Sequence, residues 1–128
     1  MTVVDASLMV EALTDGTGTA AEALLGAPNL IAPAHLDAEV GHALRSLVRG
    51  NVLQAHEANS CLDDLARSRI RRVGLTPLLH RAFELRDYAT FYDSLYLALA
   101  ELHLATLLTV DATLSKVPGV RCSVEVVE

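Results

Sequence analysis

Four acidic residues in this sequence occupy positions from which carboxylates could act together. Asp5 directly follows the apolar run TVV, and Asp111 follows the run LLTV. Asp93 begins a segment whose later residues are almost all apolar, and Glu39 lies on or beside the apolar stripe of a helical pattern. In open parallel sheets, ligands bind outside the carboxyl ends of the strands. These four side chains are therefore the first candidates for a functional site.

Each of the four also has a purely structural interpretation. Aspartate favours the N-cap position of helices, and both Asp5 and Asp111 precede short helical patterns. Thr90 and Asp93 resemble a capping box, although that motif usually has Glu or Gln at its last position. Taken singly, capping is the favoured role of the aspartates. Glu39 has no Lys or Arg three or four residues later, so its partner must be a backbone amide, an arginine from another helix, or a cation.

A divalent metal would allow four carboxylates to share one site. Without a cation, carboxylates gathered at one end of a sheet would repel one another. Mg²⁺ and Mn²⁺ take oxygen ligands and are commonly held by one or two carboxylates together with substrate phosphate. Such a metal activates water and stabilises charge during phosphodiester hydrolysis. The pattern is compatible with this chemistry but is weak alone, because the chain contains sixteen Asp and Glu residues.

The elements that must position these residues alternate between short β-branched runs and longer helical patterns. This alternation predicts one α/β domain, residues 1–128, with a mainly parallel sheet. No linker or repeat interrupts it. The expected strands are 2–5, 30–31, 70–73, 106–110 and 121–127, the last at a sheet edge. The expected helices are 6–13, 20–25, 35–49, 52–66, 76–86 and 92–103.

Composition narrows the functional classes further. A net charge of −6, a pI near 5.3 and only five aromatic residues argue against simple RNA binding. Nearly all basic residues are arginines, so Arg67–Arg72 could form a local basic rim or simply a solvated helix end. The longest apolar run, Leu95–Ala100, is too short to span a membrane. Two unclustered cysteines, Cys61 and Cys122, and the lack of a secretion signal predict a cytoplasmic protein.

Four segments of the chain resemble the PIN-domain family, in order and over the full length. They are VVDASLMVEAL, APAHLDAEVGHALR, YDSLYLALAE and LLTVDATLSK. The length of 128 residues is similar to that of the VapC-type toxins of bacterial toxin-antitoxin pairs. The resemblance implies a three-layer α/β/α fold and an endoribonuclease that depends on one or two Mg²⁺ or Mn²⁺ ions. It also implies a cognate antitoxin, a segment of which covers the acidic site.

The resemblance places the family's acids on Asp5, Glu39, Asp93 and Asp111. We expect Asp5 and Asp93 to be direct metal ligands, and Glu39 and Asp111 to complete the cluster or hold metal-bound waters. The resemblance also implies that Ser7 and Thr109 are hydrogen-bonding neighbours of the site. Because RNA must approach an acidic protein, we expect basic side chains to contact its phosphates. The candidates are Arg45, Arg49 and Lys116.

Two further interpretations of the sequence differ from a metal-dependent nuclease. Glu39 and His42 have the spacing of half a di-iron helix-bundle motif, but the second Glu-x-x-His is absent. The second is a PIN-fold interaction protein that binds a partner or RNA without turnover, and it stays open. The Leu- and Ala-rich helices also suggest a homodimer formed through an apolar face. Metal binding would separate the enzyme from the non-catalytic protein.

Overall fold

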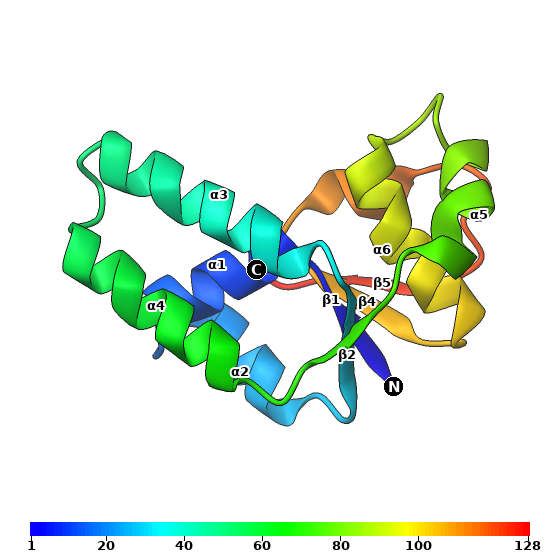
Figure 1. Ribbon diagram of the computed structural model, residues 1–128. Coiled ribbons are helices and arrows are strands. Elements are labelled where there is room, and N and C mark those ends of the chain that lie inside the picture. Colours follow the sequence, from blue (N-terminus) through cyan, green and yellow to red (C-terminus); the bar gives the residue numbers. More distant parts are fainter.

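A five-stranded parallel sheet forms the centre of the molecule (Figure 1). The computed structural model describes residues 1–128. The strands follow the order β3-β2-β1-β4-β5, and every neighbouring pair is parallel. Their bounds are β1 Thr2–Val4, β2 Leu30–Pro33, β3 Arg71–Val73, β4 Thr106–Thr109 and β5 Val124–Val126. The β5 strand is at an edge, as the sequence predicts.

Helices cover both sides of this sheet, so the predicted three-layer α/β/α fold is confirmed. In Figure 1, α1 to α4 lie on one side of the sheet and α5 and α6 on the other. None of the helices combines the length and the apolar character that a membrane crossing requires. The bounds are α1 Ala6–Thr14, α2 Thr19–Gly26, α3 Leu36–Arg49, α4 Ala55–Arg67, α5 Leu79–Glu84 and α6 Phe91–Leu102, with 3₁₀ turns η1 Thr76–Leu78 and η2 Ala112–Lys116.

The core is formed where β1 and α6 meet. All residues of β1 are buried, because parallel strands are covered on both faces. Seven consecutive residues of α6, Ser94 to Ala100, are also buried. A helix that is apolar on all sides belongs in the interior. The first turn of α6, which contains Asp93, is less buried and is therefore held in place by the firmly packed remainder of the helix.

The largest differences from the predicted elements are in three places, and the other boundaries differ by one or two residues. The helix expected from residue 52 begins at Ala55, because Gln54 and Glu57 form a capping box. The segment 76–86 divides into the 3₁₀ turn η1 and the short α5. The last strand is shorter than predicted, since the backbone N–H of Arg121 donates to Glu101 and not to the sheet.

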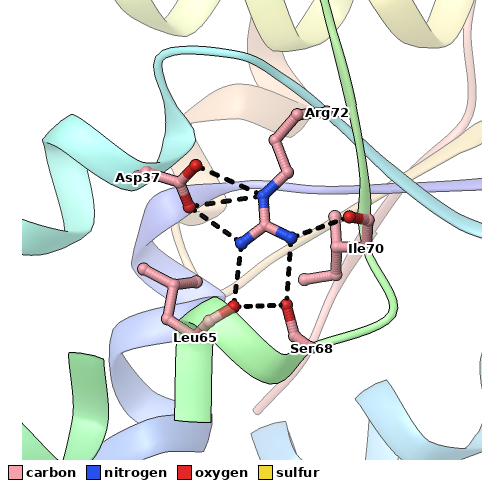
Figure 2. Close-up of polar contacts among 5 residues, drawn as sticks. All are labelled: Asp37, Leu65, Ser68, Ile70 and Arg72. Atoms are coloured by element: carbon pink, nitrogen blue, oxygen red, sulfur yellow. Dashed lines mark hydrogen bonds and ion pairs between the residues drawn. The ribbon is translucent and has the colours of Figure 1, made fainter. Parts of the chain in front are cut away.

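Arg72 joins three elements into one rigid unit (Figure 2). Its guanidinium donates to the Asp37 carboxylate at 2.9 Å and to the backbone oxygens of Leu65 and Ile70 at 2.9 and 2.8 Å. It also donates to the Ser68 hydroxyl at 3.2 Å. These contacts fix the start of α3 against the end of α4 and β3. Arg72 thus supports the helix that carries the candidate Glu39 and is not a free member of a basic rim.

Candidate functional site

Asp5 lies at the carboxyl end of β1, where the sheet register sets it beside Thr109. Val4 pairs with Leu108 across β1 and β4, so the next residues of the two strands are neighbours. Asp5 is 4% exposed. Its Oδ1 accepts hydrogen bonds from the Leu8 N–H at 3.0 Å and the Ser7 hydroxyl at 2.8 Å. The hydrogen bond from the Leu8 N–H confirms the predicted N-cap role of Asp5. The additional hydrogen bond from the Ser7 hydroxyl shows that this carboxylate does more than cap the helix.

The second oxygen of Asp5 is held from the other strand. The Thr109 hydroxyl donates to Oδ2 at 2.5 Å and accepts the Asp111 N–H at 2.9 Å. Burial raises the pKa of Asp5 above its usual value, and the hydrogen bonds from Thr109, Leu8 and Ser7 offset only part of this increase. The nearby charge of Asp93 raises this pKa further. Ser7 and Thr109 therefore fix the orientation of a carboxylate that is costly to ionise.

Glu39 has two protein partners that the sequence analysis did not name. The Tyr96 hydroxyl donates to its Oε1 at 2.6 Å, and His35 Nε2 lies 3.2 Å from the same oxygen. The expectation of a backbone amide, an arginine or a cation as partner therefore missed these two side chains. Burial raises the pKa of Glu39, but the hydrogen bonds from His35 and Tyr96 outweigh it, and the pKa lies below its usual value.

The position of the proton on His35 follows from its surroundings. Its Nε2 faces two acceptors, the Glu39 carboxylate and the backbone oxygen of Tyr92 at 3.0 Å. Nε2 must therefore carry a hydrogen. The ring packs 4.7 Å from the Tyr96 ring, between centroids, and its Nδ1 is buried without a partner. His35 thus connects the first turn of α6 to Glu39.

Asp93 and Asp111 complete the acidic group. Asp93 is in the first turn of α6, where the Thr90 hydroxyl caps its backbone N–H at 3.1 Å. Burial raises the pKa of Asp93, and the charges of Glu39 and Asp111 raise it further. Asp111 caps η2 through a hydrogen bond from the Thr113 N–H at 3.0 Å. Electrostatic coupling thus links Asp93 with each of the other three acids, and the structure brings all four to one end of the sheet.

A cleft of about 840 Å³ opens mainly between α1 and α3, and of the four acids only Glu39 lines it. Ser7 and Glu39 lie in its wall. The wall is otherwise largely apolar and contains no lysine or arginine. Its remaining lining residues are Ala6, Val10, Glu11, His35, Ala38, His42, Ala43, Tyr92 and Val110.

The carboxylates of this site have no lysine or arginine partner. The ion pairs of the structure join His35 to Glu39, Arg72 to Asp37, and Arg81 to Glu84 and Glu101. The carboxylate oxygens of Asp5, Glu39, Asp93 and Asp111 suit a hard, oxygen-preferring dication such as Mg²⁺ or Mn²⁺, which would relieve the repulsion between these acids. As the side chains stand, no three of them form a ready coordination group.

The three basic residues expected to contact RNA lie elsewhere. Arg45 and Arg49 are exposed residues in the second half of α3, and Lys116 is exposed at the end of η2. None of the three lines the cleft. Any contact of these three residues with RNA would therefore be outside the cleft between α1 and α3.

Two of the residues that sequence reasoning missed had a detectable signal. His35 precedes Glu39 by four residues, which places both side chains on the same face of a helix. Tyr96 follows Asp93 by three residues, and it is the one aromatic residue within a fully apolar run. A buried tyrosine hydroxyl usually has a hydrogen-bond partner, so its position predicts a polar neighbour.

The chain matches the PIN domain family over residues 2–120. It is 40% identical to Ribonuclease VapC1 of Mycobacterium tuberculosis, over 98% of this chain and 96% of that protein. The crystal structure of FitAcB from Neisseria gonorrhoeae superposes with a TM-score of 0.72 at 18% identity, covering 97% of this chain and 96% of that one. VapC20 of M. tuberculosis, described as a toxin that cleaves the sarcin-ricin loop, gives a TM-score of 0.68 at 18% identity, covering 94% and 97%.

These matches define the class of protein. The five-stranded parallel sheet with helices on both sides is a fold of the PIN type. The chain belongs to the PIN-domain family, and its full-length similarity to Ribonuclease VapC1 places it among the VapC-type members.

Proposed function

We propose that this protein is a divalent-metal-dependent endoribonuclease that acts as the toxin of a toxin-antitoxin pair. The observation that supports the proposal is that four acids from separate segments lie at one end of the sheet, influence one another electrostatically and have no lysine or arginine partner. Similarity to proteins named ribonuclease VapC supports the choice of RNA as substrate.

The chain's own residues hold the acids in place. Asp5 is fixed by Ser7, Thr109 and the backbone of α1, so both of its oxygens have set directions. Glu39 is fixed by Tyr96 and His35. Preorganised ligands lose little freedom when a cation binds, so such support strengthens metal binding.

In this proposal Asp5 and Asp93 bind Mg²⁺ or Mn²⁺ directly, and Glu39 and Asp111 complete the site. When bound, one or two such ions lower the pKa of water and stabilise the charge of the reacting phosphate. Without a cation, burial raises the pKa values of Asp5 and Asp93, and the charges of neighbouring acids raise them further. We therefore expect metal binding to release protons and to be weaker at acidic pH.

A cleavage assay with single-stranded RNA tests the proposal. Purified protein should cleave a labelled RNA oligonucleotide with Mg²⁺ or Mn²⁺, and a chelator should stop cleavage reversibly. Asp93→Asn should be inactive, whereas Asp63→Asn, which changes an exposed acid on α4, should keep full activity. Chelator-insensitive cleavage, or equal activity of the two variants, would contradict the proposal.

The same assay addresses the non-catalytic alternative. An interaction protein with this fold would bind RNA or a partner but would leave the oligonucleotide intact under every metal condition. It would also bind no Mn²⁺. If the wild type binds Mn²⁺ and cleaves RNA while Asp93→Asn does neither, the alternative is excluded.

We further propose a cytoplasmic protein that forms a homodimer and binds a cognate antitoxin. Exposed apolar side chains, among them Leu25, Leu102 and Leu104, offer surface for such contacts. A gene directly upstream encoding a small protein with a DNA-binding N-terminus would support the antitoxin. Light scattering of the purified chain tests the dimer.

Phosphate contacts from Arg45, Arg49 and Lys116 also stay part of the proposal. Because these residues are exposed and do not line the cleft, they would bind RNA phosphates on the surface outside it. Charge reversal at each should weaken RNA cleavage without lowering the melting temperature. Unchanged cleavage by all three variants would remove them from the proposed interface.

A further inference from the structure

The aromatic residues of this chain are concentrated in one segment. All five lie between Phe83 and Tyr96, in α5, the connection to α6, and the first half of α6. Tyr96 is buried and binds Glu39. The other four are exposed, with Tyr88 at 60% and Tyr92 at 61%. The chain therefore places large apolar rings in solvent near its acidic site.

Of the four exposed Phe and Tyr residues, only Tyr92 lines the cleft between α1 and α3. It directly precedes Asp93 in the first turn of α6, and its ring lies 6.0 Å from the His35 ring, between centroids. Its backbone oxygen accepts the hydrogen bond from His35, so the main chain that carries it is fixed. The ring of Phe83, by contrast, is covered by the Arg86 guanidinium at 4.6 Å.

The charges around Tyr92 decide which part of a nucleic acid it can attract. The cleft contains Glu39 and Glu11 but no lysine or arginine, so it offers little to backbone phosphates. Proteins that bind single-stranded nucleic acid combine a basic groove with aromatic rings on which bases stack, and of these two features the cleft offers only the ring. Tyr92, exposed on a fixed main chain next to Asp93, provides such a stacking surface.

We propose that Tyr92 is a substrate-binding residue on which an unpaired base of RNA, next to the scissile phosphate, stacks. This inference rests on the proposed ribonuclease function and specifies how the same site holds its substrate. It predicts a preference for single-stranded RNA, because a base inside a duplex cannot reach the ring. Every base has a π face, so the contact itself is tolerant of sequence.

Steady-state cleavage of a single-stranded RNA oligonucleotide tests this, with the variants Tyr92→Ala, Tyr92→Phe and Tyr88→Ala. Tyr88→Ala is the matched control, since its ring is equally exposed but does not line the cleft. Tyr92→Ala should raise KM about tenfold with little change in kcat, the size expected for one stacked base. Tyr92→Phe should be within about twofold of wild type, because it keeps the ring face.

An abasic substrate makes the test specific. Removing the base that stacks should raise KM for the wild type to the level of Tyr92→Ala and should not raise it further in that variant. Mn²⁺ affinity should be equal in wild type and Tyr92→Ala, which excludes a disturbance of Asp93. Equal KM values for wild type and Tyr92→Ala, or an equal loss in Tyr92→Phe, would overturn the inference.

Failure of the proposed function gives a different result. If wild-type protein cleaves no RNA, fluorescence anisotropy with the labelled oligonucleotide, comparing Asp5→Asn with Asp5→Asn/Tyr92→Ala, still measures stacking without turnover. About tenfold weaker RNA binding by the double variant would support the base contact, and equal binding would refute it. A lower molecular mass of Tyr92→Ala in light scattering would instead show that the ring serves an interface between copies of the chain, and would also refute it.

Discussion

Two regions of this molecule use carboxylates in opposite ways. Asp37 and Glu101 each have an arginine partner: Arg72 holds the start of α3, and Arg81 donates to Glu101 at 2.7 and 3.0 Å. The acids at the carboxyl end of the sheet have no such partner. We refer to Asp37, Glu101 and their arginine partners as the paired region, and to the acids Asp5, Glu39, Asp93 and Asp111 as the acidic site.

The pKa of Glu101 differs accordingly from those of Asp5 and Asp93. Burial raises the pKa of Glu101, but the hydrogen bonds from Arg81 and from the Arg121 N–H lower it below its usual value. Burial raises the pKa values of Asp5 and Asp93, and the hydrogen bonds that they accept offset only part of this increase. The paired carboxylates stabilise the fold. Ionisation of Asp5 and Asp93 destabilises the fold, and a bound cation would offset this cost.

The largest expected effect is on activity, from Asp5→Asn. Removing a direct metal ligand should lower kcat/KM for RNA by at least about 100-fold, the upper range for supporting residues of metal sites. Asparagine can still accept the Leu8 N–H, and it removes a buried charge. Chemical denaturation should therefore show a free energy of unfolding in metal-free buffer equal to or above that of wild type. A clear loss of stability would show that Asp5 stabilises the fold, as the carboxylates of the paired region do.

The reverse result is expected for the paired region. Arg81→Ala leaves Glu101, 9% exposed, without its main partner and should lower the free energy of unfolding by about 3 kcal/mol. Mn²⁺ affinity, measured by calorimetry, should stay within about twofold of wild type because the pair is outside the acidic site. Arg67→Ala, an exposed arginine on α4, is the control and should change stability little. Equal stability of both variants would contradict the assigned role of Arg81.

Tyr96→Phe should give a smaller effect that separates positioning from folding. The variant removes the hydroxyl that orients Glu39 but keeps the buried ring. Mn²⁺ affinity should fall about tenfold, as for other residues that orient metal ligands. The free energy of unfolding should change by less than about 1 kcal/mol, because Glu39 is partly exposed and water can replace the donor. Tyr88→Phe should leave both quantities unchanged.

The smallest effects concern the pH dependence of stability in metal-free buffer. A raised pKa means that the folded state binds the proton of Asp5 more tightly, so its ionisation destabilises the fold as pH rises above the usual pKa of 3.8. Glu101 has a lowered pKa, so its contribution is present above 4.5 and is lost as pH falls through the folded value. Stability differences of Asp5→Asn and Glu101→Gln from wild type should therefore have opposite signs at pH 7 and shrink as pH falls.

Much of the fold could be predicted from the sequence because its signals are local. The three central strands β2, β1 and β4 are short, mainly apolar runs, and Thr90 and Asp5 are recognisable helix caps. The positions of the acids relative to the strands were equally visible. Strand order was not, because it depends on long-range pairing that no single segment specifies.

The parts that sequence reasoning missed depend on contacts between distant segments. The hydroxyl of Tyr96 reaches Glu39 across 57 positions of sequence, and Arg72 reaches Asp37 across 35. A count of five aromatic residues argued against stacking, but it ignored their concentration near one site. Composition averages over the chain, whereas a site depends on a few side chains in one place.

Calorimetric titration with Mn²⁺ tests the central claim most directly, using wild type, Asp93→Asn and Asp37→Asn. These two variants each neutralise one carboxylate, the first in the acidic site and the second in the paired region. We predict that wild type and Asp37→Asn bind Mn²⁺ with similar affinity and that Asp93→Asn does not bind it. If all three folded proteins take up the ion equally, or if none does, the unpaired carboxylates are not a metal site.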